Sequence, residues 1–308
     1  MGFFAKLFGF GPKTAQEHLE RAGIASQKGD WSQAIADCTE VIRLDPRLIS
    51  PYIFRADAYN AQGEHDKAIA DCNEVIRLNP ICEDAYKERG KAYLLKGEFD
   101  QAVADCTDAI RLNANFFSNT ELAEVYRNRG VAHNEKGECA KAVADISEAI
   151  RLQPTGYWSM SPDGELATSG NPNIAILHYD RGVAYSRMSD GEKAIADLTE
   201  AIRLNPQFAA AYNNRGAQYH GKGETDRAIA DYTEAIRLDP KHALACYNRG
   251  RCYAEKGQSD KAIADFTKAI CLDPRDPDSY AERAKAYRAV GDEAMAASDE
   301  SKARELRK

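Results

Sequence analysis

The chain has 308 residues, of which 44% are hydrophobic and 29% charged, so it can bury a substantial core. Its formal net charge of -7 argues against a nucleic-acid partner, which would favour a basic surface. The sequence has no phosphate loop, dinucleotide fingerprint, nucleophile elbow or zinc-ligand spacing. We therefore expect no catalytic residue, no metal and no cofactor.

The first twelve residues form an apolar segment. It is too short to span a bilayer and lacks the charged leader and cleavage site of a secretory signal, so a cytoplasmic location is expected. Phe3, Phe4, Leu7 and Phe8 share one helical face. Three interpretations stay open: the segment caps the first repeat, docks a partner, or makes weak contact with a membrane surface.

From residue 13 onward the sequence repeats itself, with a usual period of 34 residues. In the clearest copy, residues 209–242, one helical face carries Tyr212, Gly216 and Tyr219, and Pro240 follows a second helical pattern. The pattern predicts two helices in each repeat, joined by a turn. Eight turn positions recur: Gly29, Gly63, Gly97, Gly137, Ser189, Gly223, Gly257 and Gly291.

The period and these aromatic, small and Pro positions resemble the tetratricopeptide repeat (TPR) over residues 13–308. The resemblance implies an all-α, right-handed α-solenoid of eight helix pairs, whose first helices line a peptide-binding groove. We expect repeats one to four over 13–156, an insertion over 157–174, and repeats five to eight over 175–308. Glu300 and Arg304 replace apolar residues in the last helix, as expected of a polar capping helix.

An arginine occupies the same place in all eight repeats, where the family usually has leucine. An aspartate follows each arginine sixteen residues later. Because an isolated buried charge is costly, we predict a bidentate Arg–Asp pair in each repeat. The pairs are Arg21–Asp37, Arg55–Asp71, Arg89–Asp105, Arg129–Asp145, Arg181–Asp197, Arg215–Asp231, Arg249–Asp265 and Arg283–Asp299.

Two insertions interrupt the period. The residues near 117–122 predict an extended helix that begins with a capping box at Ser118. The second insertion contains a turn signal and predicts a small β-hairpin or loop, with Trp158 and Met160 on one face as candidate partner contacts. Packing on the solenoid, contact with a partner and disorder remain alternatives for this segment.

Groove-facing polar residues are the candidate binding site. Asn128, Asn214 and Asn248 occupy one equivalent position, and carboxamides can bind a peptide backbone without reading its side chains. This resembles the asparagine ladder of the O-linked N-acetylglucosamine transferase superhelix. Lys87 and Lys91 resemble part of a carboxylate clamp. The full candidate set is Lys87, Lys91, Arg127, Asn128, Asn213, Asn214, Tyr247, Asn248 and Arg251.

The resemblance implies a non-catalytic scaffold or adaptor that binds a protein or peptide in its groove. Two alternatives remain. One is a peripheral membrane assembly factor recruited by the N-terminal segment, and the other is a fixed structural subunit of a larger complex.

Three of the eight cysteines, Cys38, Cys72 and Cys106, occupy one repeat position. This spacing predicts buried apolar thiols rather than disulfides.

Overall fold

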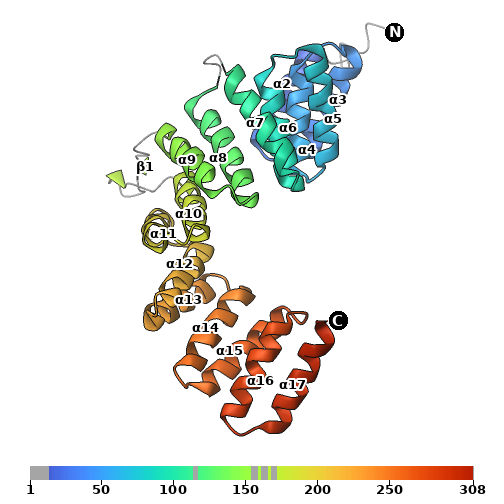
Figure 1. Cartoon of the computed structure of the whole chain (residues 1–308). Coiled ribbons are helices and arrows are strands. Elements are labelled where there is room, and N and C mark those ends of the chain that lie inside the picture. The colour runs from blue at the N-terminus through green and yellow to red at the C-terminus, as the bar shows by residue number, and fades with distance from the viewer. Residues whose placement is uncertain (1–13, 114–116, 154–158, 161–165, 168–171, 308) are drawn as a thin grey trace. The chain divides into compact units, whose positions relative to one another are not determined.

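The chain forms sixteen α-helices and one pair of two-residue strands within the part that the structure describes (Figure 1). The computed structural model describes residues 14–113, 117–153, 159–160, 166–167 and 172–307. It divides into two compact bodies, residues 1–153 and 154–308, called here the N-terminal and the C-terminal body. Each body contains four helix pairs, so the fold is an all-α solenoid of helix pairs.

In each repeat a first helix precedes a second helix. The N-terminal body contains α2 (Ala15–Gln27), α3 (Trp31–Leu44), α4 (Ser50–Ala61), α5 (His65–Leu78), α6 (Glu83–Lys96), α7 (Phe99–Leu112), α8 (Asn119–Glu135) and α9 (Cys139–Leu152). The C-terminal body contains α10 (Pro172–Arg187), α11 (Gly191–Leu204), α12 (Ala209–Gly221), α13 (Thr225–Leu238), α14 (Ala243–Glu255), α15 (Ser259–Leu272), α16 (Pro277–Ala289) and α17 (Glu293–Leu306).

The first helices form a continuous surface within each body. Consecutive first helices contact one another, as α4 does α6 and α12 does α14. Among the described residues, consecutive second helices make no such contact. Each body therefore curves with its first helices on the inner side, and we call that surface the A-helix face.

The turn between the two helices of a repeat is left-handed in every copy. The seven glycines at this position have φ between 70° and 85°. Ser189 takes the same place in the fifth repeat with φ 60°, which is uncommon for a residue with a side chain. The repeat alignment predicted this role for Ser189, and the prediction is confirmed.

Close helix packing explains the small residue in each first helix. A Cβ added at Gly250 would lie 2.8 Å from Phe266, and one at Gly216 would lie 2.9 Å from Tyr232. Phe266 and Tyr232 are fully buried. Two of the three repeats whose facing residue is a cysteine carry an alanine instead, Ala22 opposite Cys38 and Ala56 opposite Cys72, whereas the third keeps Gly90 opposite Cys106. The two positions therefore compensate each other in size.

The predicted bidentate Arg–Asp pairs are present in every repeat but the first. In seven repeats the arginine Nε and Nη2 each donate to one oxygen of its aspartate, at 2.7–2.8 Å. The aspartates are buried. Arg215 also lies between the rings of Tyr212 and Tyr219, with its guanidinium carbon 5.7 and 5.8 Å from their centroids. These contacts compensate the cost of burying a charge.

The same arginines also join consecutive repeats. Nη1 of Arg249 donates to Thr233 of the preceding second helix at 3.0 Å, and Nη1 of Arg89 donates to Asn73 at 2.6 Å. Each such guanidinium therefore connects two second helices.

The first pair is weaker than the others. Arg21 lies 3.4 Å from Asp37 and is half-exposed. His18 Nδ1, at 2.7 Å, and Gln33 Nε2, at 2.9 Å, are the closer partners of the Asp37 carboxylate. The prediction of a bidentate pair is therefore wrong for the first repeat, where His18 and Gln33 together occupy the Asp37 carboxylate.

The first insertion lengthens a helix, as predicted. α8 is 17 residues long and begins after a complete capping box. The Ser118 hydroxyl accepts from the backbone N–H of Glu121, and the Glu121 carboxylate accepts from the backbone N–H of Ser118.

In the second insertion, β1 (Ser159–Met160) pairs antiparallel with β2 (Leu166–Ala167). Of the predicted hairpin, only this pairing belongs to the described residues. Trp158 and the turn lie outside them, as do Phe3, Phe4, Leu7 and Phe8.

The last helix carries a polar outer face, as its sequence indicates. Glu300 accepts from Arg288 at 2.6 Å in place of the apolar contact made by the equivalent Phe266, and Arg304 is exposed. Within the described residues, none of the helices has both the length and the apolar character that a bilayer crossing requires.

The repeating cysteines are free thiols in the core. Cys38, Cys72 and Cys106 are all buried, and burial raises the pKa of Cys38 and of Cys106 to about 12. Such thiols remain protonated and unreactive at neutral pH, which agrees with their predicted packing role.

Candidate functional site

The candidate residues of the N-terminal body lie in a charged cluster on its A-helix face. Lys87 contacts Asp84 at 2.9 Å and Glu121 at 3.6 Å. Lys91 contacts Asp57 at 3.1 Å and Glu124 at 3.8 Å. The two lysines thus already face carboxylates from α4, α6 and α8, where a carboxylate clamp would require them to face a ligand.

Glu88 lies buried between these two lysines, and sequence reasoning missed it. Its carboxylate is 3.8 Å from Lys87 and 4.0 Å from Lys91, too far for hydrogen bonds. Asn60 Nδ2 approaches it at 3.5 Å. Burial raises the pKa of Glu88 to about 7, although Lys91 and Lys87 oppose the shift. For both lysines, burial disfavours the charged form, but the surrounding carboxylates, Glu88 foremost, outweigh it and raise the pKa.

Arg127 and Asn128, the other two candidates of this body, lie next to each other on α8. The Asn128 side chain is buried, so it is less accessible to a partner than its repeat position suggested. The N-terminal body therefore presents a largely self-neutralised surface at the predicted positions.

In the C-terminal body the predicted asparagines form a hydrogen-bonded row across three first helices. Asn248 on α14 donates from Nδ2 to Asn213 Oδ1 at 3.3 Å. Asn213 donates to Asn214 Oδ1 at 3.1 Å, and Asn214 donates to the Tyr179 hydroxyl on α10 at 3.1 Å. We call these four residues the amide row.

The members of the amide row differ in accessibility. Asn213 is 3% exposed and joins its neighbours from within, whereas Asn214 and Asn248 are half-buried. Each carboxamide nitrogen carries two hydrogens, and each row bond uses one. The half-buried amides therefore retain hydrogen-bonding capacity towards a ligand.

Tyr179 is the row member that sequence reasoning missed. Its ring lies 4.8 Å from that of Phe208, and burial raises the pKa of its hydroxyl against the effect of the Asn214 hydrogen bond. Tyr179 occupies the repeat position of Asn213, one repeat earlier, so the alignment already placed its hydroxyl beside the asparagines. A comparison of all polar side chains at one repeat position, rather than of asparagines alone, would have identified Tyr179.

Tyr247 and Arg251 extend the same face along α14. Tyr247 is half-buried and packs with its ring 5.9 Å from Phe266. Arg251, one turn later, is exposed. The structure thus places five of the nine candidates together on one face: Asn213, Asn214, Tyr247, Asn248 and Arg251.

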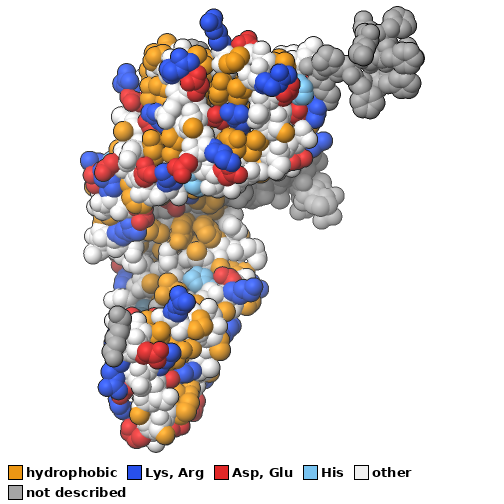
Figure 2. Space-filling view, turned by 90° about the vertical axis from the view of Figure 1, so that its right-hand side faces the viewer, with side chains coloured by type: hydrophobic (Ala, Val, Ile, Leu, Met, Phe, Trp, Pro, Cys, Tyr) orange, Lys and Arg blue, Asp and Glu red, His pale blue; other side chains and the backbone are white. Residues whose placement is uncertain are grey.

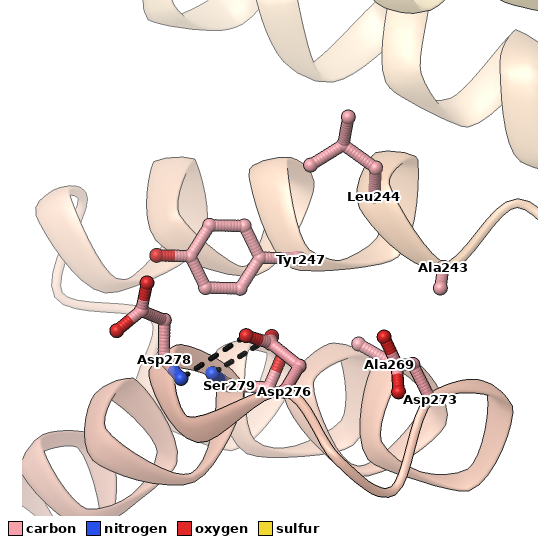
Figure 3. A pocket seen from close by; sticks show the side chains of 8 residues that line it. All are labelled: Ala243, Leu244, Tyr247, Ala269, Asp273, Asp276, Asp278 and Ser279. Carbon is pink, nitrogen blue, oxygen red and sulfur yellow. Dashed lines mark hydrogen bonds between the residues drawn. The ribbon is translucent and has the colours of Figure 1, made fainter. Parts of the chain in front are cut away.

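A cavity of about 290 Å³ lies beside Tyr247, between α14, α15 and the start of α16 (Figure 3). Figure 3 shows Tyr247 extending over Asp276 and Asp278, with Asp273 below Ala243. No sequence pattern singled this cavity out, because it is built from three successive helices. The available signal was the presence of aspartates where the preceding repeat has His242 and Leu244.

Acidic and basic side chains mix on the surface. On the face drawn in Figure 2, Lys and Arg lie among Asp and Glu across the described residues, with apolar side chains between them. In the same described part of the chain, no group of three His, Cys, Asp or Glu side chains is placed to hold a metal ion.

Family models match the repeats directly. A tetratricopeptide repeat model matches residues 209–242 and 243–276, a second matches 53–115, and a TPR repeat model matches 190–223. The chain is a tetratricopeptide repeat protein. No curated protein sequence matches it.

Solved TPR structures share this fold. A tetratricopeptide repeat protein from Parabacteroides merdae superposes with a TM-score of 0.60 and 15% identity, over 88% of this chain and 98% of that one. The APC/C hetero-tetramer Cut9–Hcn1 matches with a TM-score of 0.62 and 16% identity, over 90% of this chain. This TPR chain spans about half the length of the Cut9–Hcn1 chain that it matches, covering 50% of it. At these identities the likeness concerns the fold alone.

Proposed function

We propose that this TPR protein is a non-catalytic scaffold that binds an extended segment of a partner protein along the A-helix face of its C-terminal body. The observation that carries the proposal is the amide row. It places hydrogen-bond donors and acceptors from three consecutive first helices side by side. TPR proteins as a class serve protein–protein interaction, which supports the choice of partner.

The chemistry of the row suits a peptide backbone. An extended segment presents alternating N–H and C=O groups, and a carboxamide can pair with both. Because the row fixes the amides through mutual hydrogen bonds, little side-chain entropy remains to be lost on binding. Binding through the backbone would tolerate many partner sequences.

The N-terminal body contrasts with this arrangement. Its lysines are engaged by four carboxylates on the same face, so an acidic ligand would have to displace internal partners. We therefore place the principal binding surface on the C-terminal body. Contacts from Trp158, Met160 or the N-terminal segment remain hypotheses.

Site-specific photo-crosslinking tests the proposal. A photoreactive residue at Ala217, which is exposed one turn after Asn213, should crosslink to a partner segment in native extract. Replacing Asn214 and Asn248 together by alanine should abolish that crosslink while the helical circular dichroism signal stays unchanged. Gln101→Ala, which removes an exposed carboxamide from a second helix, serves as the control. Equal crosslinking by the double variant and the wild type would contradict the proposal.

A further inference from the structure

The cavity beside Tyr247 continues the surface that carries the amide row. Tyr247 precedes Asn248 on α14 and takes the repeat position of Asn213. Leu244, which is 55% exposed, lies one turn before it and also lines the cavity. A segment bound along the row would therefore reach the cavity without leaving the A-helix face.

Three carboxylates line this cavity, and among the described residues only one of them, Asp278, is paired with an arginine. Asp278 accepts from Arg307 at 2.8 Å. Asp276 accepts from the backbone N–H groups of Asp278 and Ser279 at 3.1 and 3.0 Å, and so caps α16. Asp273 accepts from the backbone N–H of Arg275 at 3.1 Å. Backbone dipoles do not cancel a full charge, so the cavity keeps a negative potential.

The carboxylates also act on the Tyr247 hydroxyl. Burial is the largest cause of its raised pKa, but Glu282, Asp278 and Asp276 raise it further, while Arg251 opposes them. Two of the lining aspartates, Asp276 and Asp278, also fall outside the repeat pattern. The equivalent residues are Phe208 and Ala210 in one repeat, and His242 and Leu244 in the next.

We propose that this cavity accepts an arginine or lysine side chain of the bound partner segment. The proposal takes from the proposed function only that a segment runs along this face. Its apolar wall, Leu244 and the ring of Tyr247, suits the aliphatic stem of such a side chain, and an aromatic face also attracts the cation. At about 290 Å³ the cavity is at the lower limit of small-molecule sites, which suits a single side chain.

Three pentapeptides test the charge preference: acetyl-Gly-Ser-Xaa-Ser-Gly-amide, with arginine, citrulline or norleucine at Xaa. They are titrated into the isotope-labelled full chain, and the backbone amide shifts of Leu244, Tyr247 and Ser279 are followed. We expect saturable shifts, with the arginine peptide binding about three- to five-fold more tightly than the citrulline peptide. An equal affinity for all three peptides, or shifts that do not saturate, would overturn the proposal.

Asp273→Asn with Asp276→Asn tests the carboxylates. Asparagine keeps the capping acceptor at position 276, and asparagine already stands at the place of Asp273 in an earlier repeat, at Asn205. The variant should therefore fold and lose the arginine preference. Asp239→Asn, the same loop position one repeat earlier, should keep it. A preference that survives in Asp273→Asn/Asp276→Asn would sink the assignment.

A further arm separates this inference from the proposed function. In the Asn214→Ala/Asn248→Ala variant, weaker binding of all three peptides with an unchanged arginine preference supports both. If that variant binds all three as the wild type does and the arginine preference holds, the cavity assignment stands and the amide row does not. If that variant binds all three peptides more weakly and the wild type shows no arginine preference, the amide row stands and the cavity assignment does not.

Discussion

The two bodies build their A-helix faces from the same helix pairs and use them differently. In the N-terminal body, Lys87 and Lys91 are held by internal carboxylates around the buried Glu88. In the C-terminal body, Asn213 stands at the position of Lys87, and Asn214 and Asn248 stand at the position of Glu88. These amides bond to one another and retain hydrogen-bonding capacity. The comparison teaches that the solenoid frame and the surface chemistry are specified by separate positions of the repeat. A shared frame therefore predicts a groove without predicting where a partner binds.

The largest expected effect concerns the frame that both bodies share. Arg215→Leu should cost about 3–5 kcal/mol of unfolding free energy, because Asp231 would be left buried and unpaired. Arg89→Leu in the other body should cost a similar amount. Replacing Asp231 by leucine as well as Arg215 should recover much of the loss. Denaturant unfolding followed by circular dichroism measures these differences.

The first rung provides the control. Arg21→Leu should cost clearly less than Arg215→Leu, because His18 and Gln33 bond to Asp37. Equal losses in the two variants would show that the ladder does not depend on bidentate pairing.

A second comparison between the bodies concerns the size of the buried side chain that faces the glycine of the first helix. Gly250→Ala should cost about 1–3 kcal/mol, because its Cβ would lie 2.8 Å from the buried Phe266 ring. Gly90→Ala should cost less, since it faces Cys106, and this chain already pairs alanine with cysteine at Ala56 and Cys72. Thermal unfolding of the two variants compares them. A larger loss for Gly90→Ala would contradict the size compensation.

The pH dependence of stability tests whether the buried Glu88 of the N-terminal body is costly to ionise. Its pKa is about 7 in the folded chain against an ordinary 4.5, so the folded state binds this proton more tightly. The stabilisation from protonation is complete below about pH 4.5 and declines as the pH rises to about 7.

Glu88→Gln removes the ionisable group and should therefore stabilise the protein at pH 8. Its advantage over the wild type should be about 2–3 kcal/mol larger at pH 8 than at pH 5. Denaturant unfolding at both pH values gives this difference. An advantage that does not grow with pH would mean that the lysines hold Glu88 ionised at little cost.

The sequence predicted the frame because the frame recurs. The Arg–Asp offset occurs in all eight copies and the turn glycine in seven, so the copies can be compared with one another, and the turn at Ser189 was predicted by alignment alone. The exception is Arg21, because only the first repeat combines a histidine and a glutamine at the two positions that bond to its aspartate, His18 and Gln33. Each type occurs once more by itself, as His178 and Gln101. A repeat pattern cannot report an interaction that does not repeat.

The candidate site was predictable only in part for the same reason. Asn214 and Asn248 were found because they share a position, whereas Tyr179 shares the position of Asn213 with a different residue type. The pairing of Lys87 with Glu121 required knowledge of how far the lengthened α8 reaches. Such contacts depend on distances between helices, and those distances follow from packing rather than from the spacing of residues.

The smallest expected effect tests whether the lysine cluster takes part in binding. Lys91→Gln should weaken the binding of acetyl-Gly-Ser-Gly-Ser-Gly with a free C-terminal carboxylate by less than about two-fold, as for an exposed ion pair. The reason is that Asp57 and Glu124 already contact this ammonium group, at 3.1 and 3.8 Å, so a ligand carboxylate gains little by competing. Isothermal titration against the wild type, with the amidated peptide as control, measures the change. A loss of ten-fold or more, absent for the amidated peptide, would show that a ligand carboxylate does displace these residues. The binding surface would then extend to the N-terminal body, and the contrast between the two faces would be one of degree.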